Sequence, residues 1–468
     1  MNRVFSENSL DVLAQKVRKL LKETGYSVQY EPMFLYLKEK GLKESSDGRL
    51  VFDDALIDEF VSFQKKRQAE KKKTVSASSG RQSSDFSMSL GNMVPKYYDY
   101  SSKTPQLAQM EHLKKMAKFA HVEKRISNIA LPFSVTDIPL ATAPIEGFLG
   151  MVRLTDKYCF SIDPYSLELV KYLVELSEIF LGTGQQNKFI DHCNCINPIL
   201  RLEERTAAVM FERAKYNIDS LMTSMPTAGG NAPVTLDGTV IQGTSEILGG
   251  LIFSYLLNPE IEHVGYISSS VMDFRTATTT QSSPETVLVD CGVVELMEFA
   301  FGGNTRIGGR TYVSATRPGM QAVFEKMLKA AAYQKYTGSL SYAGGGILDN
   351  GAMLSPEQLM IDMNIAESFH SLHEVELKDD NVEAVIMDVA SAGTGDFLST
   401  DHTLNNYRGS FWEPFLFTHG STMSEQEILD KSNGYFTDKL KSYSGYDFEE
   451  DKVSEGEKIL IKAKKELL

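Results

Sequence analysis

Residues 221–268, LMTSMPTAGGNAPVTLDGTVIQGTSEILGGLIFSYLLNPEIEHVGYIS, decide the fold of this chain. The apolar run at residues 221–225 predicts a strand, the loop that follows is rich in Gly and Pro, and residues 245–257 predict a largely apolar helix. A second strand is predicted at residues 264–268. A strand, a helix and another strand in succession form the repeating unit of α/β proteins.

The same alternation extends through most of the chain. Short β-rich runs predict eight strands, at residues 86–90, 129–135, 158–162, 189–195, 221–225, 264–268, 311–315 and 339–343. Helices fit between them, for example at residues 167–180, 203–216, 245–257 and 321–336. Because no early Gly-x-Gly-x-x-Gly turn marks a doubly wound nucleotide-binding sheet, the pattern favours a (β/α)8 TIM barrel, whose chemistry lies in loops at the carboxyl ends of the strands.

Segments of different composition flank the predicted barrel at residues 86–420. Leu10, Leu13 and Val17 recur at helical spacing, and residues 1–70 are therefore predicted to form a helical N-terminal cap. Residues 71–85 are charged and then Ser-rich, which predicts an exposed linker. Residues 421–468 predict a C-terminal helical extension.

Composition excludes several classes of protein. The 468 residues are 42% hydrophobic and 24% charged, which is typical of a globular protein with a large core. A formal net charge of −14 argues against nucleic acid or an anionic membrane as the main partner. No run approaches the ~20 apolar residues of a membrane span, and the N-terminus lacks the apolar stretch of a signal peptide, so a cytoplasmic location is expected. Four Cys in a chain of this length do not make a disulfide framework.

The only Trp lies in residues 393–417, GTGDFLSTDHTLNNYRGSFWEPFLF. This stretch combines a Gly-containing loop, a helix start with His402 in its first turn, and aromatic residues that include Phe397 and Trp412. Such a combination indicates a functional site. The alternative is a C-terminal segment whose aromatic side chains dock on the core.

Four groups of residues together carry a resemblance to a known family. They are residues 225–236, MPTAGGNAPVTL, with GTSE at 243–246; Gly395-Asp396-Phe397-Leu398 with His402-Thr403 and Trp412-Glu413-Pro414; residues 345–351, GGILDNG; and residues 355–359, SPEQL. In order and spacing they resemble the trimethylamine methyltransferase superfamily, whose members deliver methyl groups to corrinoid proteins. The resemblance covers nearly the whole chain.

Two positions depart from the family pattern. The pyrrolysine of the founding enzymes aligns at or next to Thr316, so no pyrrolysine is expected here. The chain therefore resembles the branch that demethylates quaternary amines, typified by glycine betaine methyltransferase. Asp396 stands where the family has a loop His, and whether this residue alters activity is left open.

The resemblance implies a methyltransferase that moves a methyl group from glycine betaine or a related quaternary amine to the Co(I) of a cognate corrinoid protein by in-line displacement. The leaving group is a neutral tertiary amine, so no general base is needed, and the enzyme has to orient the substrate and exclude water. An aromatic cage suits a methylated cation. Candidate cage residues are Tyr97, Tyr98, Tyr342, Phe397 and Trp412, although each could instead be a packing residue.

Polar groups complete the candidate site. Arg317 is predicted to bind a substrate carboxylate, with Arg275 and Arg310 as second choices and ordinary surface pairing as the alternative. Glu246, Asn350 and His402 are predicted to orient the substrate or the corrinoid. Each also has a structural interpretation: a helix-dipole contact, a tight turn and a satisfied structural histidine, respectively.

Two further features of the sequence concern a zinc site and an oligomer. His192-Cys193-Asn194-Cys195 places two thiols on one face of a predicted strand, but a closed zinc site would need distant partners such as His263 or Cys291, and the superfamily implies no zinc. Two alternative functions stay open: a zinc-assisted barrel methyltransferase, and a non-catalytic binder or sensor of methylated amines. An apolar helix surface could join subunits of a homo-oligomer, at Met320, Val323, Phe324 and Met327.

Overall fold

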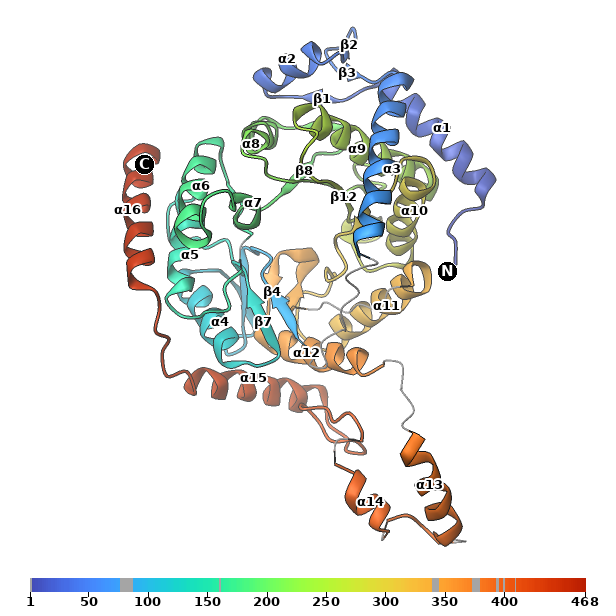
Figure 1. The fold of residues 1–468 in the computed structure, drawn as a ribbon, viewed down its shortest axis with the longest axis vertical. Coiled ribbons are helices and arrows are strands. Elements are labelled where there is room, and N and C mark those ends of the chain that lie inside the picture. Colours follow the sequence, from blue (N-terminus) through green and yellow to red (C-terminus); the bar gives the residue numbers. More distant parts are fainter. Residues whose placement is uncertain are drawn as a thin grey trace.

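A computed structural model describes residues 2–75, 87–159, 161–338, 345–372, 379–392, 395–398, 400–408 and 410–468 (Figure 1). Its centre is a series of parallel strands. β8 (Cys193–Ile196), β10 (Ser220–Ser224), β12 (His263–Ile267) and β15 (Thr305–Ile307) are hydrogen-bonded neighbours in the order β8, β10, β12, β15. The order of these strands in the sheet follows their order in the chain, as in a barrel wall.

The strands that precede β8 continue the same arrangement. β4 (Met88–Leu90) pairs in parallel with β7 (Ile126–Ile129), and single parallel bridges join Ile129 to Tyr158 and Ile162 to Ile190. The predicted α/β class with parallel strands is thus confirmed, whereas no closed barrel is detected in the part of the chain that the structure describes.

Helices separate the strands and cover one face of the sheet. They are α4 (Met110–Val122), α5 (Ala143–Val152), α6 (Leu167–Leu181), α7 (Gln186–Phe189), α8 (Glu204–Lys215), α9 (Leu236–Leu257), α10 (Pro284–Ala300) and α11 (Met320–Thr337). The predicted helices at 167–180, 203–216 and 321–336 agree with α6, α8 and α11 to within one or two residues. α9 begins earlier than predicted, at a Thr235 cap whose side chain accepts a hydrogen bond from the Gly238 amide.

The predicted strand at 311–315 is wrong, the one at 129–135 shares only Ile129 with β7, and the one at 158–162 is reduced to the bridges at Tyr158 and Ile162. Residues 311–315 are a loop, and the seventh parallel strand is instead β15, which precedes the Gly308-Gly309 pair. The backbone of this loop bonds to other loops, because the Asn350 amide donates to the Val313 carbonyl at 2.7 Å and the Asp349 amide donates to the Ala315 carbonyl at 2.9 Å. The predicted strand at 339–343 lies outside the described residues.

Short elements line the loops. They are β5 (Lys96–Asp99), β6 (Thr104–Leu107), β9 (Arg201–Leu202), β11 (Thr227–Ala228), β13 (Ser270–Asp273), β14 (Thr278–Thr280), β16 (Ile347–Leu348), the 3-10 turn Asp349–Gly351 and β17 (Met353–Leu354). β5 and β6 form an antiparallel pair, as do β13 and β14, and β17 joins β5 in parallel. These elements place the loops at the carboxyl ends of the strands.

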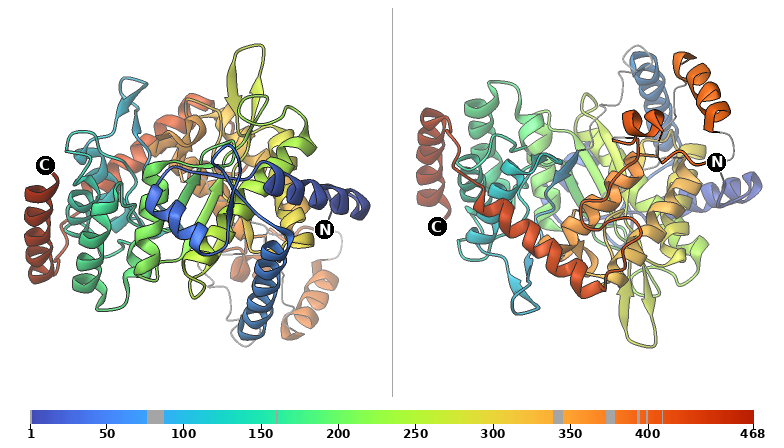
Figure 2. Two further views of the ribbon diagram at one scale, coloured as in Figure 1. Left: turned by 90° about the horizontal axis from the view of Figure 1, so that it is seen from above. Right: turned by 90° about the horizontal axis from the view of Figure 1, so that it is seen from below.

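The N-terminal cap packs onto the helix layer. It consists of α1 (Glu7–Glu23), β1 (Ser27–Val28), α2 (Glu31–Glu39), β2 (Lys43–Glu44), β3 (Leu50–Val51) and α3 (Asp54–Val75), and Figure 2 shows it lying over the helices coloured green to yellow. Buried Leu10 and Leu21 of α1 share one hydrophobic cluster with Ile247 and Phe253 of α9. The cap therefore has no separate core. α3 continues to Val75, beyond the predicted end of the cap at residue 70.

Two helices end the chain, and a pair of helices projects from the body. α15 (Glu425–Lys441) packs on α12 (Pro356–His370), and α16 (Glu450–Leu467) packs on α6 and α5, where a Cβ on Gly456 would meet Leu149 of α5 at 2.7 Å. Figure 1 shows α13 (Asp379–Ala392) and α14 (Asp401–Asn406) standing away from the body in the lower part of the view. We call residues 379–408, where described, the projecting arm.

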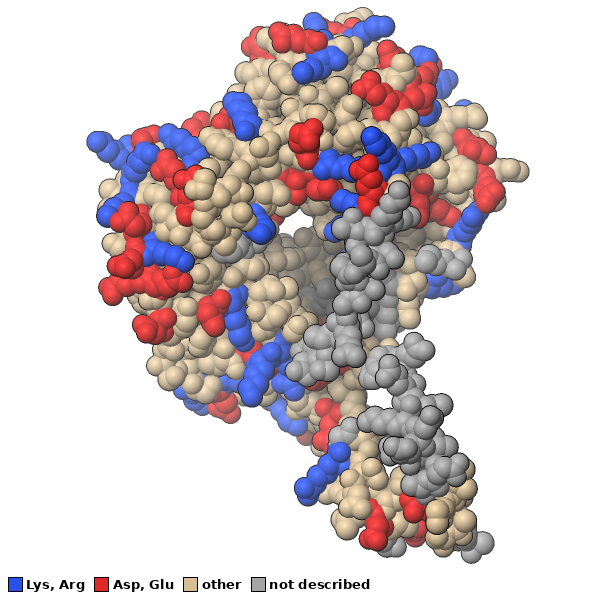
Figure 3. Space-filling model, in the orientation of Figure 1, with Lys and Arg blue, Asp and Glu red and all other residues tan. Residues whose placement is uncertain are grey.

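Surface charge and helix hydropathy agree with the composition. Figure 3 shows acidic and basic side chains interspersed over the visible face, which is hollowed near the centre of the molecule. Among the described helices, α9 alone is long and apolar enough to cross a membrane, and 78% of its most apolar window is buried in the protein. This burial identifies α9 as a helix of the core.

Candidate active site

The two faces of the central strands can be distinguished by their contacts with α9. A Cβ on Gly250 of α9 would meet Met222 at 2.5 Å, and a Cβ on Gly265 of β12 would meet Ile247 of α9 at 2.5 Å. Met222 and Gly265 therefore face the helix layer. Because side chains alternate along a strand, Thr223 and Tyr266 point to the interior side of the sheet.

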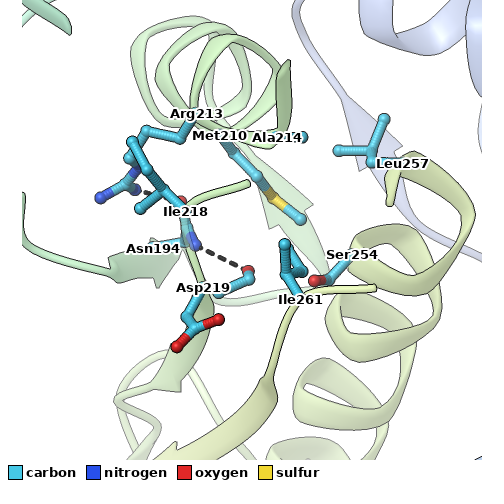
Figure 4. A pocket seen from close by; sticks show the side chains of 10 residues that line it. Asn194, Met210, Arg213, Ala214, Ile218, Asp219, Ser254, Leu257 and Ile261 are labelled. Atoms are coloured by element: carbon cyan, nitrogen blue, oxygen red, sulfur yellow. Dashed lines mark hydrogen bonds between the residues drawn. The ribbon is translucent and has the colours of Figure 1, made fainter. Parts of the chain in front are cut away.

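β8 shows the same alternation. In Figure 4, Asn194 points toward α8, where the Arg213 guanidinium donates to its Oδ1; its Nδ2 donates to Ser220 Oγ at 3.0 Å. The cavity beside them is about 10 Å³, which holds one water molecule at most and excludes a methylated amine. Cys193 and Cys195, on either side of Asn194, therefore face the interior.

Four interior side chains come from four neighbouring strands at the same level. The strand register pairs Cys195 with Thr223, Thr223 with Tyr266, and Tyr266 with Arg306. Neighbouring strands lie about 4.8 Å apart, and partners in a parallel register point to the same face. We call Cys195, Thr223, Tyr266 and Arg306 the interior layer. Each is the penultimate residue of its strand, so the layer lies at the carboxyl ends, where barrel enzymes hold their substrates.

Arg306 supplies the positive charge of this layer. Its side chain is exposed, and it makes no hydrogen bond or ion pair with any residue that the structure describes. A guanidinium carries five N–H donors in a planar fork that matches a carboxylate. Arg306 is thus suited to bind an anionic group of a ligand that enters the interior.

The two interior thiols lie close together. Cys193 Sγ is 3.9 Å from Cys195 Sγ and 3.3 Å from Thr223 Oγ1, which confirms the prediction that both thiols share one face of the strand. The contact between the thiols raises the pKa of Cys193 well above its ordinary value and lowers the pKa of Cys195. Cys195 is therefore the thiol that ionises first.

Tyr312 and Asp163 adjoin the thiols. Burial raises the pKa of the Tyr312 hydroxyl, and the charges of the two Cys raise it further, which places this tyrosine beside the pair. Burial also raises the pKa of Asp163, and neighbouring Asp191 adds to the shift. Tyr312 adds an aromatic ring to the interior, and Asp163 adds a carboxyl group that is easier to protonate than usual.

The predicted cage residues Tyr97 and Tyr98 lie on β5 and are 8% and 4% exposed. Tyr97 stacks on His112, with ring centroids 4.3 Å apart and 10° between the ring planes. Tyr98 packs in a small cluster with Val313 and Leu348. Protein side chains therefore contact both rings, and a cage role for either tyrosine stays a prediction.

The three predicted arginines lie outside the interior layer. Arg317 is exposed in the loop before α11, and its charge acts on the hydroxyl of Tyr98. Arg275 pairs with Asp273 at 2.7 Å in the β13–β14 hairpin. Arg310 lies 5.8 Å from the centre of the Tyr333 ring.

Glu246 is fully buried on α9, and its carboxylate accepts hydrogen bonds from three donors. Its Oε2 accepts from Ser224 Oγ at 2.6 Å, and its Oε1 accepts from the Leu200 amide at 3.1 Å and from Gln242 Nε2 at 3.0 Å. Burial raises the pKa of this carboxyl. Glu246 therefore ties α9 to the end of β10 and to the loop after β8.

Glu246→Ala should destabilise the fold by about 1 to 3 kcal/mol, because the Ser224 hydroxyl and the Leu200 amide would lose their acceptor while buried. The loss would be measured by urea unfolding. Glu246→Gln, which keeps the shape and one acceptor oxygen, is the matched control and should lose less. A Glu246→Ala protein with unchanged stability and no activity would instead assign Glu246 to the site.

Asn350 occupies a turn with left-handed backbone angles (φ 51°). Its Oδ1 accepts from Ser314 Oγ at 3.3 Å, and its Nδ2 donates to the Thr279 carbonyl at 3.2 Å. The side chain thus joins two loops at the carboxyl ends of the strands. The tight turn suggested by its sequence is observed, and an orienting role stays a prediction.

The candidate site residues near the C-terminus lie in two different parts of the structure. Phe397 and His402 lie together on the projecting arm, with ring centroids 6.2 Å apart, and His402 Nδ1 is 2.9 Å from Asp388 Oδ2. Trp412 lies at the base of the arm and borders an apolar cavity of about 520 Å³ between α11, α12 and α15. The structure brings neither group to the interior layer. Tyr342 lies outside the described residues.

His263 and Cys291, the distant zinc ligands suggested by the sequence, lie on different elements. His263 Nδ1 bonds Ser254 Oγ at 2.7 Å on the helix side of β12, and Cys291 is buried on α10. Among the described residues, no group of three or more His, Cys, Asp and Glu side chains could hold a metal ion.

Arg306, Tyr266 and Tyr312 were missed by the sequence analysis. The alternation Thr305-Arg306-Ile307 would have indicated Arg306 if the seventh strand had been placed at 305–307 and not at 311–315. Tyr266 lies inside the predicted strand 264–268, but its inward direction depends on the packing of α9.

The comparisons with known protein sequences indicate one family of methyltransferases. The family model of trimethylamine methyltransferase (MTTB) matches residues 1–455. The glycine betaine methyltransferase of Desulfitobacterium hafniense (strain Y51) is 24% identical over 449 residues, which cover 92% of this chain and 90% of that protein. The trimethylamine methyltransferase MttB of Methanosarcina barkeri (strain Fusaro / DSM 804) is 28% identical over 255 residues, or 53% of this chain and 51% of that protein.

Among solved structures, the monomethylamine methyltransferase MtmB of Methanosarcina barkeri is 12% identical, with a TM-score of 0.42 over 94% of this chain and 93% of that one. This is a weak structural likeness.

Proposed function

The chain belongs to the trimethylamine methyltransferase family, and we propose that it transfers a methyl group from glycine betaine or a related quaternary amine to the Co(I) of a cognate corrinoid protein. The observation that carries the choice of substrate is the interior layer, in which Arg306 lies one strand away from Tyr266. A betaine has the complementary charges, since it carries a methylated ammonium group and a carboxylate.

Substrate binding would use the charge of Arg306 and the aromatic rings of Tyr266 and Tyr312. Arg306 would hold the carboxylate through paired hydrogen bonds. Tyr266 and Tyr312 would present ring faces to the methylated nitrogen, which an aromatic face attracts through its quadrupole. One N-methyl group would then point toward the open carboxyl ends of the strands.

The residues of this chain have to bind, orient and shield the substrate. When its carrier protein docks, the corrinoid supplies a Co(I) nucleophile. The amine leaves as a neutral tertiary amine, so no side chain needs to donate a proton. Because the nitrogen loses its charge, a fixed carboxylate beside it would stabilise the substrate more than the transition state. Burial raises the pKa of Asp163, the carboxyl group near the interior thiols, and so disfavours its charged form.

The interior layer fits a cofactor that is presented from outside. Cys195 and Arg306 are exposed although they lie on the interior side of the sheet, and both stand one residue from the carboxyl end of their strands. The layer is therefore open toward the strand ends. These exposed residues would border the space that the corrinoid has to reach.

The remaining parts of the proposal concern architecture and location. We propose that the parallel strands belong to a (β/α)8 barrel, that residues 71–85 link the cap to it, and that the enzyme works in the cytoplasm. Exposed Met320, Phe324 and Met327 on α11 form an apolar surface that could join subunits. Phe397, His402 and Trp412 stay candidates for contact with the corrinoid protein.

A panel of quaternary amines tests the proposed function. Glycine betaine, proline betaine, carnitine and γ-butyrobetaine would each be incubated with the enzyme and a competent Co(I) corrinoid acceptor, without nucleotide or added zinc. At least one should give a change in the corrinoid absorbance spectrum together with the matching tertiary amine, detected by mass spectrometry. Trimethylamine is the control and should react far more slowly. If no betaine is demethylated by an acceptor that is active with another methyltransferase, the chain is a binder or sensor and not this enzyme.

A further inference from the structure

Cys193 and Cys195 have a geometry that the proposed methyl transfer does not use. The two Sγ atoms are 3.9 Å apart on the interior side of β8. Cys195 is exposed, and Cys193 is half-buried behind it, in contact with Thr223 Oγ1 at 3.3 Å. An exposed thiol with a second thiol in contact is the arrangement found in redox-sensing cysteines.

The other two cysteines differ in chemistry. Cys291 is buried on α10, and burial raises its pKa to about 12. Burial raises the pKa of Cys159 to about 11. Both are therefore protonated at neutral pH and react slowly, because the thiolate is the reactive form. Cys195 is the one thiol of the four whose pKa is lowered.

We propose that Cys193 and Cys195 form a peroxide-sensitive dithiol, in which Cys195 is oxidised first and Cys193 then closes a disulfide. This inference stands on the thiol geometry and does not depend on the proposed function.

Two balanced steps describe the reaction. The Cys195 thiolate attacks one oxygen of hydrogen peroxide, the O–O bond breaks, and the products are Cys195 sulfenic acid and hydroxide. The Cys193 sulfur, on losing its proton to this hydroxide, attacks the Cys195 sulfur, the S–O bond breaks with release of hydroxide, and a disulfide forms. Overall, two thiols lose two hydrogens and one peroxide becomes two waters.

The disulfide should be readily reversible. Residues two apart on an extended strand have Cα atoms about 6.6 to 6.8 Å apart, which is the upper limit of the disulfide range. A disulfide held at this limit is reduced more easily than a relaxed one. Thiol reductants should therefore restore the dithiol, as a switch requires.

Oxidation would alter the interior layer itself, because Cys195 is one of its four members and lies next to Thr223. If the proposed function holds, the disulfide would alter the site under oxidising conditions, in which a Co(I) acceptor does not survive.

Peptide mass mapping tests the proposal on the purified full-length chain. Reduced protein is treated with hydrogen peroxide, quenched and alkylated. The expected product is a Cys193–Cys195 disulfide, seen as the loss of two hydrogens from one peptide and of two of the four titratable thiols. Dithiothreitol should reverse it. A disulfide that joins any other pair, or oxidation that spares all four thiols, would overturn the proposal.

Single variants separate the roles of the two thiols. In Cys193→Ser, Cys195 should stop at the sulfenic acid and be trapped by dimedone, whereas Cys195→Ser should react roughly tenfold or more slowly than the wild type. Cys159→Ser and Cys291→Ser are matched controls and should form the disulfide normally. Identical behaviour of the Cys193 and Cys195 variants would contradict the assignment.

Alkylation of the folded wild-type protein tests the same assignment without a variant. N-Ethylmaleimide should label Cys195 of the untreated wild type before Cys159 and Cys291, and first labelling of either of those two would also contradict the assignment. Loss of betaine demethylation after oxidation is a further readout. If demethylation is never observed, the proposed function fails, but the mass result still decides the status of the dithiol.

Discussion

Arg306→Ala should weaken binding of glycine betaine by about 2 to 4 kcal/mol, or roughly 30- to 1000-fold in Kd, and leave binding of tetramethylammonium within about threefold of the wild type. The reason is that only the betaine carries a carboxylate for the guanidinium to hold. Isothermal titration calorimetry measures both ligands without the corrinoid protein. Arg306→Lys keeps the charge but loses the planar fork, so its affinity should be intermediate.

Arg317→Ala is the matched control for Arg306→Ala. Both residues are exposed arginines near the carboxyl ends of the strands, but only Arg306 belongs to the interior layer. If Arg317→Ala loses betaine and Arg306→Ala does not, Arg317 holds the carboxylate, as the sequence predicts. Equal losses of betaine and tetramethylammonium in Arg306→Ala would remove Arg306 from carboxylate binding.

Asp362→Ala should destabilise the fold by about 3 to 5 kcal/mol, which is the largest effect expected of a single substitution here. The Asp362 and Lys326 side chains are 0% and 1% exposed and form an ion pair between α12 and α11. Asp362 also accepts from the Gly346 amide at 2.8 Å and from Gln358 Nε2 at 2.9 Å. Removing the carboxylate would take one negative partner from the buried Lys326 and would remove the acceptor of the Gly346 and Gln358 donors.

Urea unfolding of two further variants shows whether the buried charge causes the loss of stability in Asp362→Ala. Replacing both partners, as Lys326→Met with Asp362→Leu, should cost less than Asp362→Ala alone, because no charge stays buried. Lys171→Ala breaks an exposed pair with Glu466, both 44% exposed, and should leave the urea midpoint nearly unchanged. If Asp362→Ala unfolds within about 1 kcal/mol of the wild type, the buried pair does not anchor α12 to α11.

Sequence patterns located the long helices and most of the parallel strands. α6 was placed to within one residue because its apolar residues recur at helical spacing over four turns. The strand at 305–307 was missed because three residues are too few to show an alternation. The run at 311–315 has strand-like residues, but its backbone groups are satisfied outside the sheet: the Val313 carbonyl accepts from the Asn350 amide, and the Ser314 amide donates to Glu325 Oε2 of α11.

Sequence patterns predict less of the candidate site than of the fold. That Cys193 and Cys195 face the same way follows from alternation within one strand, and this prediction is confirmed by their Sγ–Sγ distance. That Cys195, Thr223, Tyr266 and Arg306 lie side by side depends on the register of four strands drawn from more than a hundred residues of chain. Local patterns carry no information on such a register. Tyr97 was chosen because it follows a strand, but its stacking on His112 depends on α4.

The core that the cap shares with α9 has a consequence for synthesis of the chain. Leu10 and Leu21 of α1 become buried against Ile247 and Phe253 of α9, which the ribosome makes more than two hundred residues later. Until then the nascent cap exposes its apolar faces, although N-terminal segments usually fold first. Chaperone binding to early nascent chains should therefore concentrate on residues 7–75 and end once α9 and α10 have emerged.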